Sequence, residues 1–176
     1  VDPQAEHSDA TETFNRDLFA KLGDLGLLGI TVDERFGGSQ MDAVAAVIAH
    51  EELSAADPGF TLAYLAHAML CVNNLFQNGN DEQRARLLPD LCSGAKVGGM
   101  CMSEPGAGTD VLGMKSSARK TDGGWLLNGA KMWITNGAIS DTELGDTFLV
   151  YARTGDDRQA LSLFLVEKGM AGFSLG

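Results

Sequence analysis

Two short segments of the chain carry residue types that could hold a flat ligand with polar edges. In the first, residues 100–110, the hydroxyls of Ser103 and Thr109 flank Pro105, Gly106 and Gly108. Proline fixes φ and removes a hydrogen-bond donor, whereas glycine lets the backbone approach a ligand without a Cβ in the way. The segment therefore offers backbone N–H groups and two hydroxyls to the edge of a ring.

The second segment, residues 131–137, has the sequence Lys-Met-Trp-Ile-Thr-Asn-Gly. Trp133 and Thr135 are two residues apart, so on a β-strand they would face the same side. The indole could then stack on a ring while the hydroxyl binds the edge of that ring. This pairing of a stacking residue with a loop that binds an edge suits a flavin better than a phosphate.

Two competing motifs fail on their spacing. Gly106 and Gly108 begin a dinucleotide-binding pattern, but the third glycine position is Val111, and no strand leads through this loop into a helix. His50 begins a zinc-protease pattern, but the second histidine position is Ser54. The sequence therefore argues against a dinucleotide-dependent reductase and a zinc protease.

Composition sets further bounds on the protein. The chain has 176 residues, of which 44% are hydrophobic, and its formal net charge is −11. Such an acidic chain disfavours nucleic acid and anionic membrane surfaces as partners. The three cysteines lack the spacing of a metal site, which favours a reducing compartment. No apolar run approaches the ~18 residues of a membrane span, no signal peptide is visible, and a targeting segment could have been removed.

Hydrophobic spacing predicts an all-α segment over residues 1–94. Asp9 and Glu12 resemble a capping box at the start of the first helix, and Asn80 is placed to cap the last helix, which Pro89 would end. The helix over residues 41–55 is apolar almost all round, so we expect it to be buried. The predicted helices begin at Asp9, span 41–55 and 60–76, and run from Asn80 to Leu88.

Residues 95–176 change to short β-type runs separated by glycine-rich turns. Asn128-Gly129 predicts a hairpin between strands 125–127 and 131–135, because a type I′ turn requires φ > 0 twice. A second hairpin is predicted between strands 147–153 and 161–167. Residues 110–120 contain a further candidate strand.

The two segments resemble the acyl-CoA dehydrogenase family, through Met-Ser-Glu-Pro-Gly-Ala-Gly-Thr-Asp at 102–110 and Asn-Gly-Ala-Lys-Met-Trp-Ile-Thr-Asn-Gly at 128–137. Residues 27–31, 62–67 and 166–170 resemble the isovaleryl-CoA subfamily most. The resemblance implies an α+β multidomain fold: a helical domain at 1–94, an incomplete middle β-barrel domain at 95–176, and a C-terminal four-helix bundle that is absent from this chain. It also implies a catalytic glutamate in that bundle, so we expect no catalytic base here and a structural role for Glu104.

The resemblance also implies the ligand and the residues that hold it. We expect FAD to contact residues of both segments, and acyl-CoA to contact Thr109, Leu62 and Ala66. For Leu62 and Ala66, plain core packing is the competing interpretation, as an ordinary Pro-Gly turn is for the first segment. The expected FAD contacts are Met100, Cys101, Met102, Ser103, Gly108, Thr109, Trp133, Ile134 and Thr135.

The implied activity is α,β-dehydrogenation of a short or branched acyl-CoA. Isovaleryl-CoA is favoured, which would place the protein in leucine catabolism, with electrons passing to an electron-transferring flavoprotein. The expected assembly is a homotetramer or homodimer, in the mitochondrial matrix of a eukaryote or the cytoplasm of a bacterium. The alternatives are another short- or medium-chain acyl-CoA dehydrogenase and a truncated, non-catalytic fragment that binds flavin or acyl-CoA.

Overall fold

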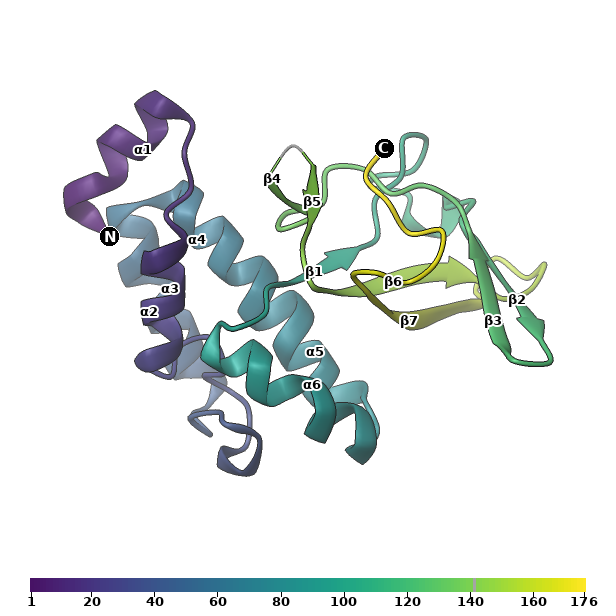
Figure 1. The fold of residues 1–176 in the computed structure, drawn as a ribbon, viewed down its shortest axis with the longest axis horizontal. Helices are drawn as coiled ribbons and strands as arrows, with labels where there is room; N and C mark the ends of the chain where they lie inside the picture. Colours follow the sequence, from purple (N-terminus) through teal and green to yellow (C-terminus); the bar gives the residue numbers. More distant parts are fainter. Residues whose placement is uncertain (141) are drawn as a thin grey trace. The chain divides into compact units, whose positions relative to one another are not determined.

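The computed structural model describes residues 1–140 and 142–176, which form two compact units, Val1–Gly98 and Gly99–Gly176. The first unit is built of helices and the second contains the strands (Figure 1). The predicted order of a helical segment followed by a β segment is therefore confirmed.

Side-chain caps set where most helices of the first unit begin. Asn15 accepts a hydrogen bond from Leu18 N at 2.8 Å, and Asn80 forms a complete capping box with Gln83. The helices and helical turns are η1 (Asp2–Gln4), α1 (Ala5–Thr11), α2 (Arg16–Asp24), η2 (Glu34–Phe36), α3 (Ala43–Ala56), α4 (Pro58–Leu65), the π-helical η3 (Ala66–Asn73), α5 (Asn74–Asn78) and α6 (Asp81–Ser93).

Two predicted helix boundaries are wrong. The helix expected to begin at Asp9 does not begin there. Asp9 lies within α1, which ends at Thr11 because Glu12 adopts φ 52°, and α2 begins after the Asn15 cap. Pro89 lies inside α6 rather than ending it. Leu91 and Cys92, beyond the proline, are buried, and their packing offsets the lost backbone hydrogen bond.

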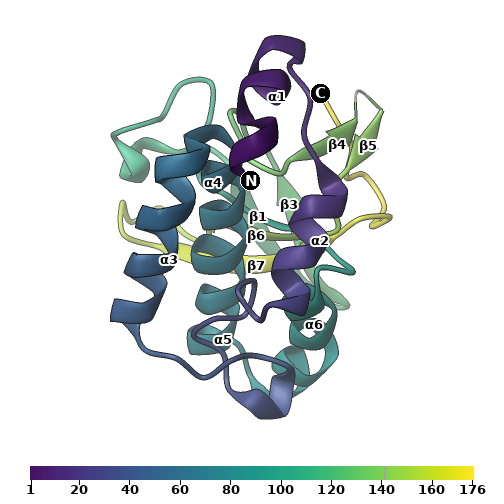
Figure 2. The same cartoon turned by 90° about the vertical axis from the view of Figure 1, so that its left-hand side faces the viewer.

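A single rod from Pro58 to Asn78, formed by α4, η3 and α5, lies at the centre of the helical unit, with α3 on one side and α2 and α6 on the other (Figure 2). Its residues Phe60, Tyr64 and Ala68 pack with residues 19, 22 and 28 in the core. By length and composition alone the rod could cross a membrane, which the sequence analysis missed. However, 56% of its most apolar window is buried, and a buried core helix passes the same test.

The expected burial of residues 41–55 is wrong. In α3, Val44, Val47 and Ile48 expose more than half of their surface, and Ala46 is buried. α3 packs against α4 on one side. Its apolar residues on the other sides therefore remain exposed, although the helix is apolar almost all round.

His67, in η3, is fully buried and uses both ring nitrogens. Nδ1 accepts a hydrogen bond from Gly98 N at 2.9 Å, so the proton is on Nε2, which donates to Leu91 O at 2.9 Å. Burial lowers the pKa of His67 from 6.5 to about 4, although the bond to Leu91 opposes this shift. The neutral imidazole therefore ties the end of α6 and the start of the first strand to the central rod.

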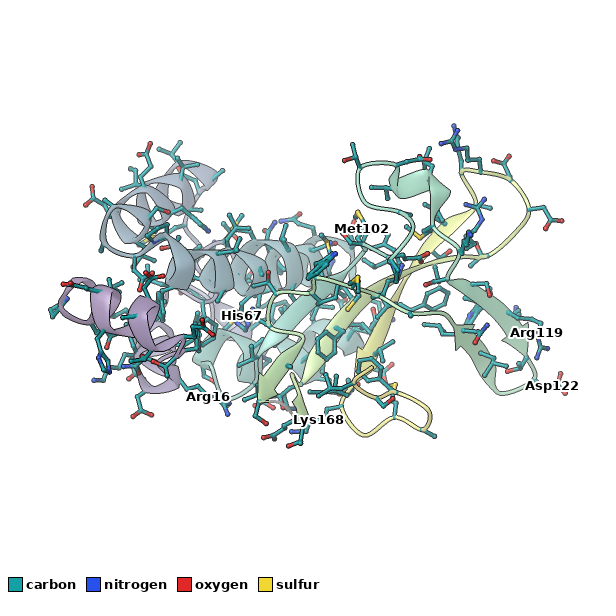
Figure 3. The ribbon with its side chains drawn as sticks, turned by 90° about the horizontal axis from the view of Figure 1, so that it is seen from above. Arg16, His67, Met102, Arg119, Asp122 and Lys168 are labelled. Atoms are coloured by element: carbon teal, nitrogen blue, oxygen red, sulfur yellow. The ribbon has the colours of Figure 1, made fainter. Side chains whose placement is uncertain are left out.

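The second unit contains β1 (Gly98–Cys101), β2 (Ser117–Thr121), β3 (Gly124–Asn128), β6 (Thr147–Arg153) and β7 (Leu161–Glu167) in one sheet. A separate ladder joins β4 (Ala138–Ser140) to β5 (Glu143–Leu144), and a helical turn, η4, spans Val111–Gly113. Sheet neighbours follow the order β1-β6-β2-β3, and β7 also pairs with β6. Asp122 is labelled at the tip of the β2–β3 hairpin in Figure 3.

One predicted hairpin is confirmed and the other is wrong. β6 and β7 are antiparallel, with Thr147 opposite Glu167 and Arg153 opposite Leu161. In contrast, β3 pairs with β2 through the Asp122-Gly123 turn, and residues 131–135 are not a strand. Gly129 adopts φ 153°, outside the range of a type I′ turn, and a Cβ there would collide with Ser116.

The titration of His67 makes stability depend on pH. The unfolded chain binds this proton with a pKa near 6.5 and the folded chain near 4, so the unfolded state holds more protons between these values. Stability is therefore full above pH 6.5 and falls toward pH 4. Between pH 6.5 and 4.5, His67 should contribute a loss of about 2 kcal/mol. Urea unfolding of the intact protein should show this loss reduced in His67→Gln but retained in His7→Gln, where the histidine is exposed. An equal dependence of the unfolding free energy on pH in the two variants would contradict this role of His67.

Candidate functional site

The two segments singled out in the sequence lie together in the sheet unit. Met132 N donates to Ser103 O at 2.9 Å, which joins the second segment to the first. A Cβ at Gly99 would lie 2.9 Å from Thr135 O, so only glycine fits where β1 passes this turn. Figure 3 labels Met102 on the loop that follows β1.

Lys131 ties the two segments through a buried side chain. Its Nζ donates to Glu104 Oε1 at 2.9 Å and to Met102 O at 3.1 Å. The exposed fractions of the Lys131 and Glu104 side chains are 10% and 6%. The pair is therefore largely removed from solvent, where an unpartnered charge of either sign would be costly.

Glu104 is saturated with donors. Its carboxylate also accepts from Lys115 N at 2.6 Å and Ser116 N at 2.9 Å. Burial alone would raise its pKa, but hydrogen bonds from Lys115, Ser116 and Lys131 lower the pKa to about 2. This carboxylate holds the loop and is a poor proton acceptor at neutral pH, in agreement with the structural role expected for it.

Trp133 and Thr135 lie in a turn, so the inference that they share the face of a strand is wrong. Trp133 adopts φ 59° and Asn136 φ 63°, and Gly137 N donates to Ile134 O at 2.9 Å to close the turn. A bulky residue at positive φ is an outlier that costs about 1–3 kcal/mol and is found mainly at functional sites. Trp133 is 84% exposed, so packing among residues 1–140 and 142–176 does not account for its conformation.

The remaining predicted cofactor residues differ in exposure. Cys101 is buried, and burial raises the pKa of its thiol to about 12 although Lys131 opposes the shift. Met100, Met102, Ser103, Ile134 and Thr135 are half-buried, whereas Gly108 and Thr109 are exposed. A Cβ at Gly108 would meet nothing within 4 Å, so no contact in the described chain requires glycine there.

The predicted acyl-contact pair lies in the helical unit. Leu62, in α4, is 56% exposed, and Ala66, the first residue of η3, is buried. Leu62 is therefore not a core residue in this unit, contrary to the packing interpretation. Among residues 1–140 and 142–176, no cluster of histidine, cysteine and carboxylate side chains could hold a metal ion.

Sequence reasoning missed the role of Lys131. The residue was noted as part of the second motif, but its partner Glu104 is 27 positions away and in a different motif. Periodicity reports only neighbours along the chain, so nothing local indicates such a pair.

Two models of known protein domains match the sequence of this chain. The model of the acyl-CoA dehydrogenase N-terminal domain matches residues 1–95, and the model of the middle domain matches residues 99–176. The chain therefore belongs to the acyl-CoA dehydrogenase family.

Individual relatives agree with this assignment. The mitochondrial isovaleryl-CoA dehydrogenase of Arabidopsis thaliana is 44% identical over 99% of this chain and 42% of its own length. A structure described as an electron-transferring flavoprotein of Acidaminococcus fermentans is 35% identical, with TM-score 0.90 over 100% of this chain and 46% of that one. An acyl-CoA dehydrogenase from Bacillus anthracis, solved with FAD, is 37% identical, with TM-score 0.83 over 97% of this chain and 28% of that one. The chain thus spans less than half of each.

The buried pair should be strongly coupled to stability. Lys131→Met leaves the Glu104 carboxylate without its cation and should lower the free energy of unfolding by about 3–5 kcal/mol. Lys168→Met is the matched control, because Lys168 pairs with Glu143 at the surface and its removal should cost about 0–1 kcal/mol. Urea unfolding of the two variants measures the difference, and similar losses would show that the Lys131 pair is not structurally important.

Proposed function

We propose that this chain is the N-terminal and middle part of an FAD-dependent acyl-CoA dehydrogenase that acts on a short branched acyl-CoA, with isovaleryl-CoA favoured. The observation that carries the proposal is the junction of the two segments by Lys131, beside the exposed, strained Trp133. The identity to an isovaleryl-CoA dehydrogenase supports the substrate class.

The residues present fit a flavin. The exposed Trp133 indole offers a flat apolar face, and Thr135 and Ser103 offer hydroxyls from the two joined segments. Gly108 leaves room for a ring or phosphate chain to approach the backbone. FAD bound here would supply the acceptor for the hydride that leaves the β-carbon of the acyl-CoA.

The chain's own residues would bind and orient. Trp133 would pack on the ring, Thr135 would hold its N5 edge and Ile134 would contribute its backbone. Met100, Cys101, Met102, Ser103 and Gly108 would line the pyrimidine side, and Thr109 would lie toward the substrate. Glu104, with its low pKa and three donor groups, would keep the loop in place and leave the α proton to another carboxylate.

The direct test is an anaerobic titration of the intact, FAD-loaded protein with isovaleryl-CoA. Loss of the visible absorbance of the oxidised flavin is expected, because dehydrogenation reduces the flavin. If the protein binds FAD but no short acyl-CoA bleaches the flavin, the proposed enzymatic activity is contradicted and the non-catalytic binding fragment is favoured. Stronger bleaching by a straight-chain substrate would favour another short- or medium-chain dehydrogenase.

The Thr135 hydroxyl should affect the rate of flavin reduction. Thr135→Val keeps the shape of the side chain and removes its hydrogen bond, a loss of about 1 kcal/mol or somewhat more, so reduction should slow by roughly fivefold to tenfold. Thr135→Ser keeps the hydroxyl and is the matched control. Stopped-flow reduction of the two variants gives the comparison, and equal rates would place the ring away from Thr135.

Leu62 should affect the choice of acyl chain. Because Leu62 is 56% exposed, Leu62→Ala should cost little stability. If Leu62 and Ala66 border the acyl site, truncation opens room for a longer tail, at about 1–3 kcal/mol per methylene of discrimination. The ratio of kcat/KM for octanoyl-CoA to that for isovaleryl-CoA should therefore rise tenfold or more. An unchanged ratio would remove Leu62 from the site.

The partners and location follow the same proposal. An electron-transferring flavoprotein is proposed as the electron acceptor, and the description of one similar solved structure names such a protein. A homotetramer or homodimer is proposed, in the mitochondrial matrix of a eukaryote or the cytoplasm of a bacterium. The net charge of −11 agrees with a protein that does not bind nucleic acid.

A further inference from the structure

Gly98, the residue at which the helical unit ends and β1 begins, is held by three side chains of the helical unit. Its N–H donates to His67 Nδ1 at 2.9 Å. A Cβ at this position would lie 2.5 Å from Cys71 Sγ and 3.3 Å from Leu91 Cδ2. The backbone of Gly98 is therefore enclosed on one side and hydrogen-bonded on another, and only glycine fits.

Two of the three side chains come from the π-helical η3, and the third, Leu91, comes from α6. His67 and Cys71 both lie in η3, and both are fully buried. Residues four apart lie on one face of a helix, so the side chains of His67 and Cys71 can reach the same target. π-Helical turns within α-helices are rare and are often found at functional sites. Figure 3 labels His67 among the helices.

The restrained residue is next in the chain to the candidate cofactor segment. Gly98 is the first residue of β1, Met100 is two residues further, and Met102 and Ser103 follow directly after the strand. One residue further along β1, the space for a Cβ at Gly99 is closed by Thr135 O. A shift of the Gly98 peptide would thus be passed along one extended strand to the residues proposed to line the flavin.

We propose that His67 is a positioning residue for the flavin site, acting through its Nδ1 bond to Gly98 N. This inference rests on the proposed flavin site at residues 100–110 and 131–137. The competing interpretation is that His67 only contributes stability, with its two hydrogen bonds equivalent. The two interpretations differ in whether the Gly98 bond and the Leu91 bond have the same effect on FAD.

Two substitutions separate the bonds. In His67→Asn, the side-chain oxygen can take the place of Nδ1 and accept from Gly98 N, while the donor to Leu91 O is lost. In His67→Gln, the amide nitrogen can take the place of Nε2 and donate to Leu91 O, while Gly98 N loses its acceptor. Each variant removes one buried hydrogen bond, so the losses in urea stability should be similar.

The test measures the FAD dissociation constant of the intact protein by flavin fluorescence. His67→Gln should weaken FAD binding about tenfold, and His67→Asn by less than about threefold, because only the former frees Gly98 N. Val32→Ala is a matched control, a buried residue that packs at Gly38, and it should lower stability without weakening FAD binding. Equal FAD affinities for the Asn and Gln variants overturn the inference. A wild type that binds no FAD overturns the proposed function instead.

A second measurement uses the wild type alone, in case the variants do not fold. If the Gly98 bond and FAD binding are coupled, FAD must in turn stabilise that bond. Amide hydrogen exchange at Gly98 should slow on addition of FAD, relative to the amide of Leu22 in the helical core. Unchanged exchange at Gly98 under FAD saturation overturns the inference.

Discussion

The candidate site depends on one buried charge pair, Lys131 and Glu104. The ammonium group satisfies a carboxylate in one motif and the carbonyl of Met102 beside it, while the carboxylate also receives two backbone N–H groups from residues 115 and 116. Both charged side chains are largely shielded from water, so each depends on the other as its partner, and the pair fixes the backbone segments that carry the two residues. The loop and the turn are consequently held by this ion pair and by the hydrogen bond from Met132 N to Ser103 O, rather than by a continuous ladder of strand pairing.

This contact also accounts for the division of roles among the polar groups. A carboxylate with a pKa near 2 stays ionised and occupied, so it stabilises geometry and leaves proton transfer to other groups. The turn beyond Lys131 lies outside the strands and holds Trp133 at φ 59° with its side chain exposed. Such strain persists only where the surrounding contacts determine the conformation. The rigid pair and the strained aromatic residue are thus parts of one arrangement.

The features that the sequence predicts well are those set by neighbouring residues. The Asn80 cap depends on Gln83 three positions away, and the β6–β7 hairpin on runs of β-forming residues around a short turn. The failures are contacts between distant residues. The strand expected at 131–135 is replaced by a turn in which Lys131 is bound to a residue 27 positions away. The exposure of the apolar α3 could not be predicted, because composition does not show which faces of a helix are covered by other elements. Pro89 is tolerated inside α6 because of the tertiary packing around residues 91 and 92.

The central claim is that the two motifs form one flavin-holding surface, fixed by Lys131 and Glu104. A crystal structure of the intact protein with FAD and an acyl-CoA analogue tests it most directly. The account predicts that the isoalloxazine contacts both the Met102–Ser103 backbone and the Trp133–Thr135 turn, with the Lys131–Glu104 pair intact beneath them. A flavin bound away from either motif, or a pair that separates when FAD binds, would contradict it.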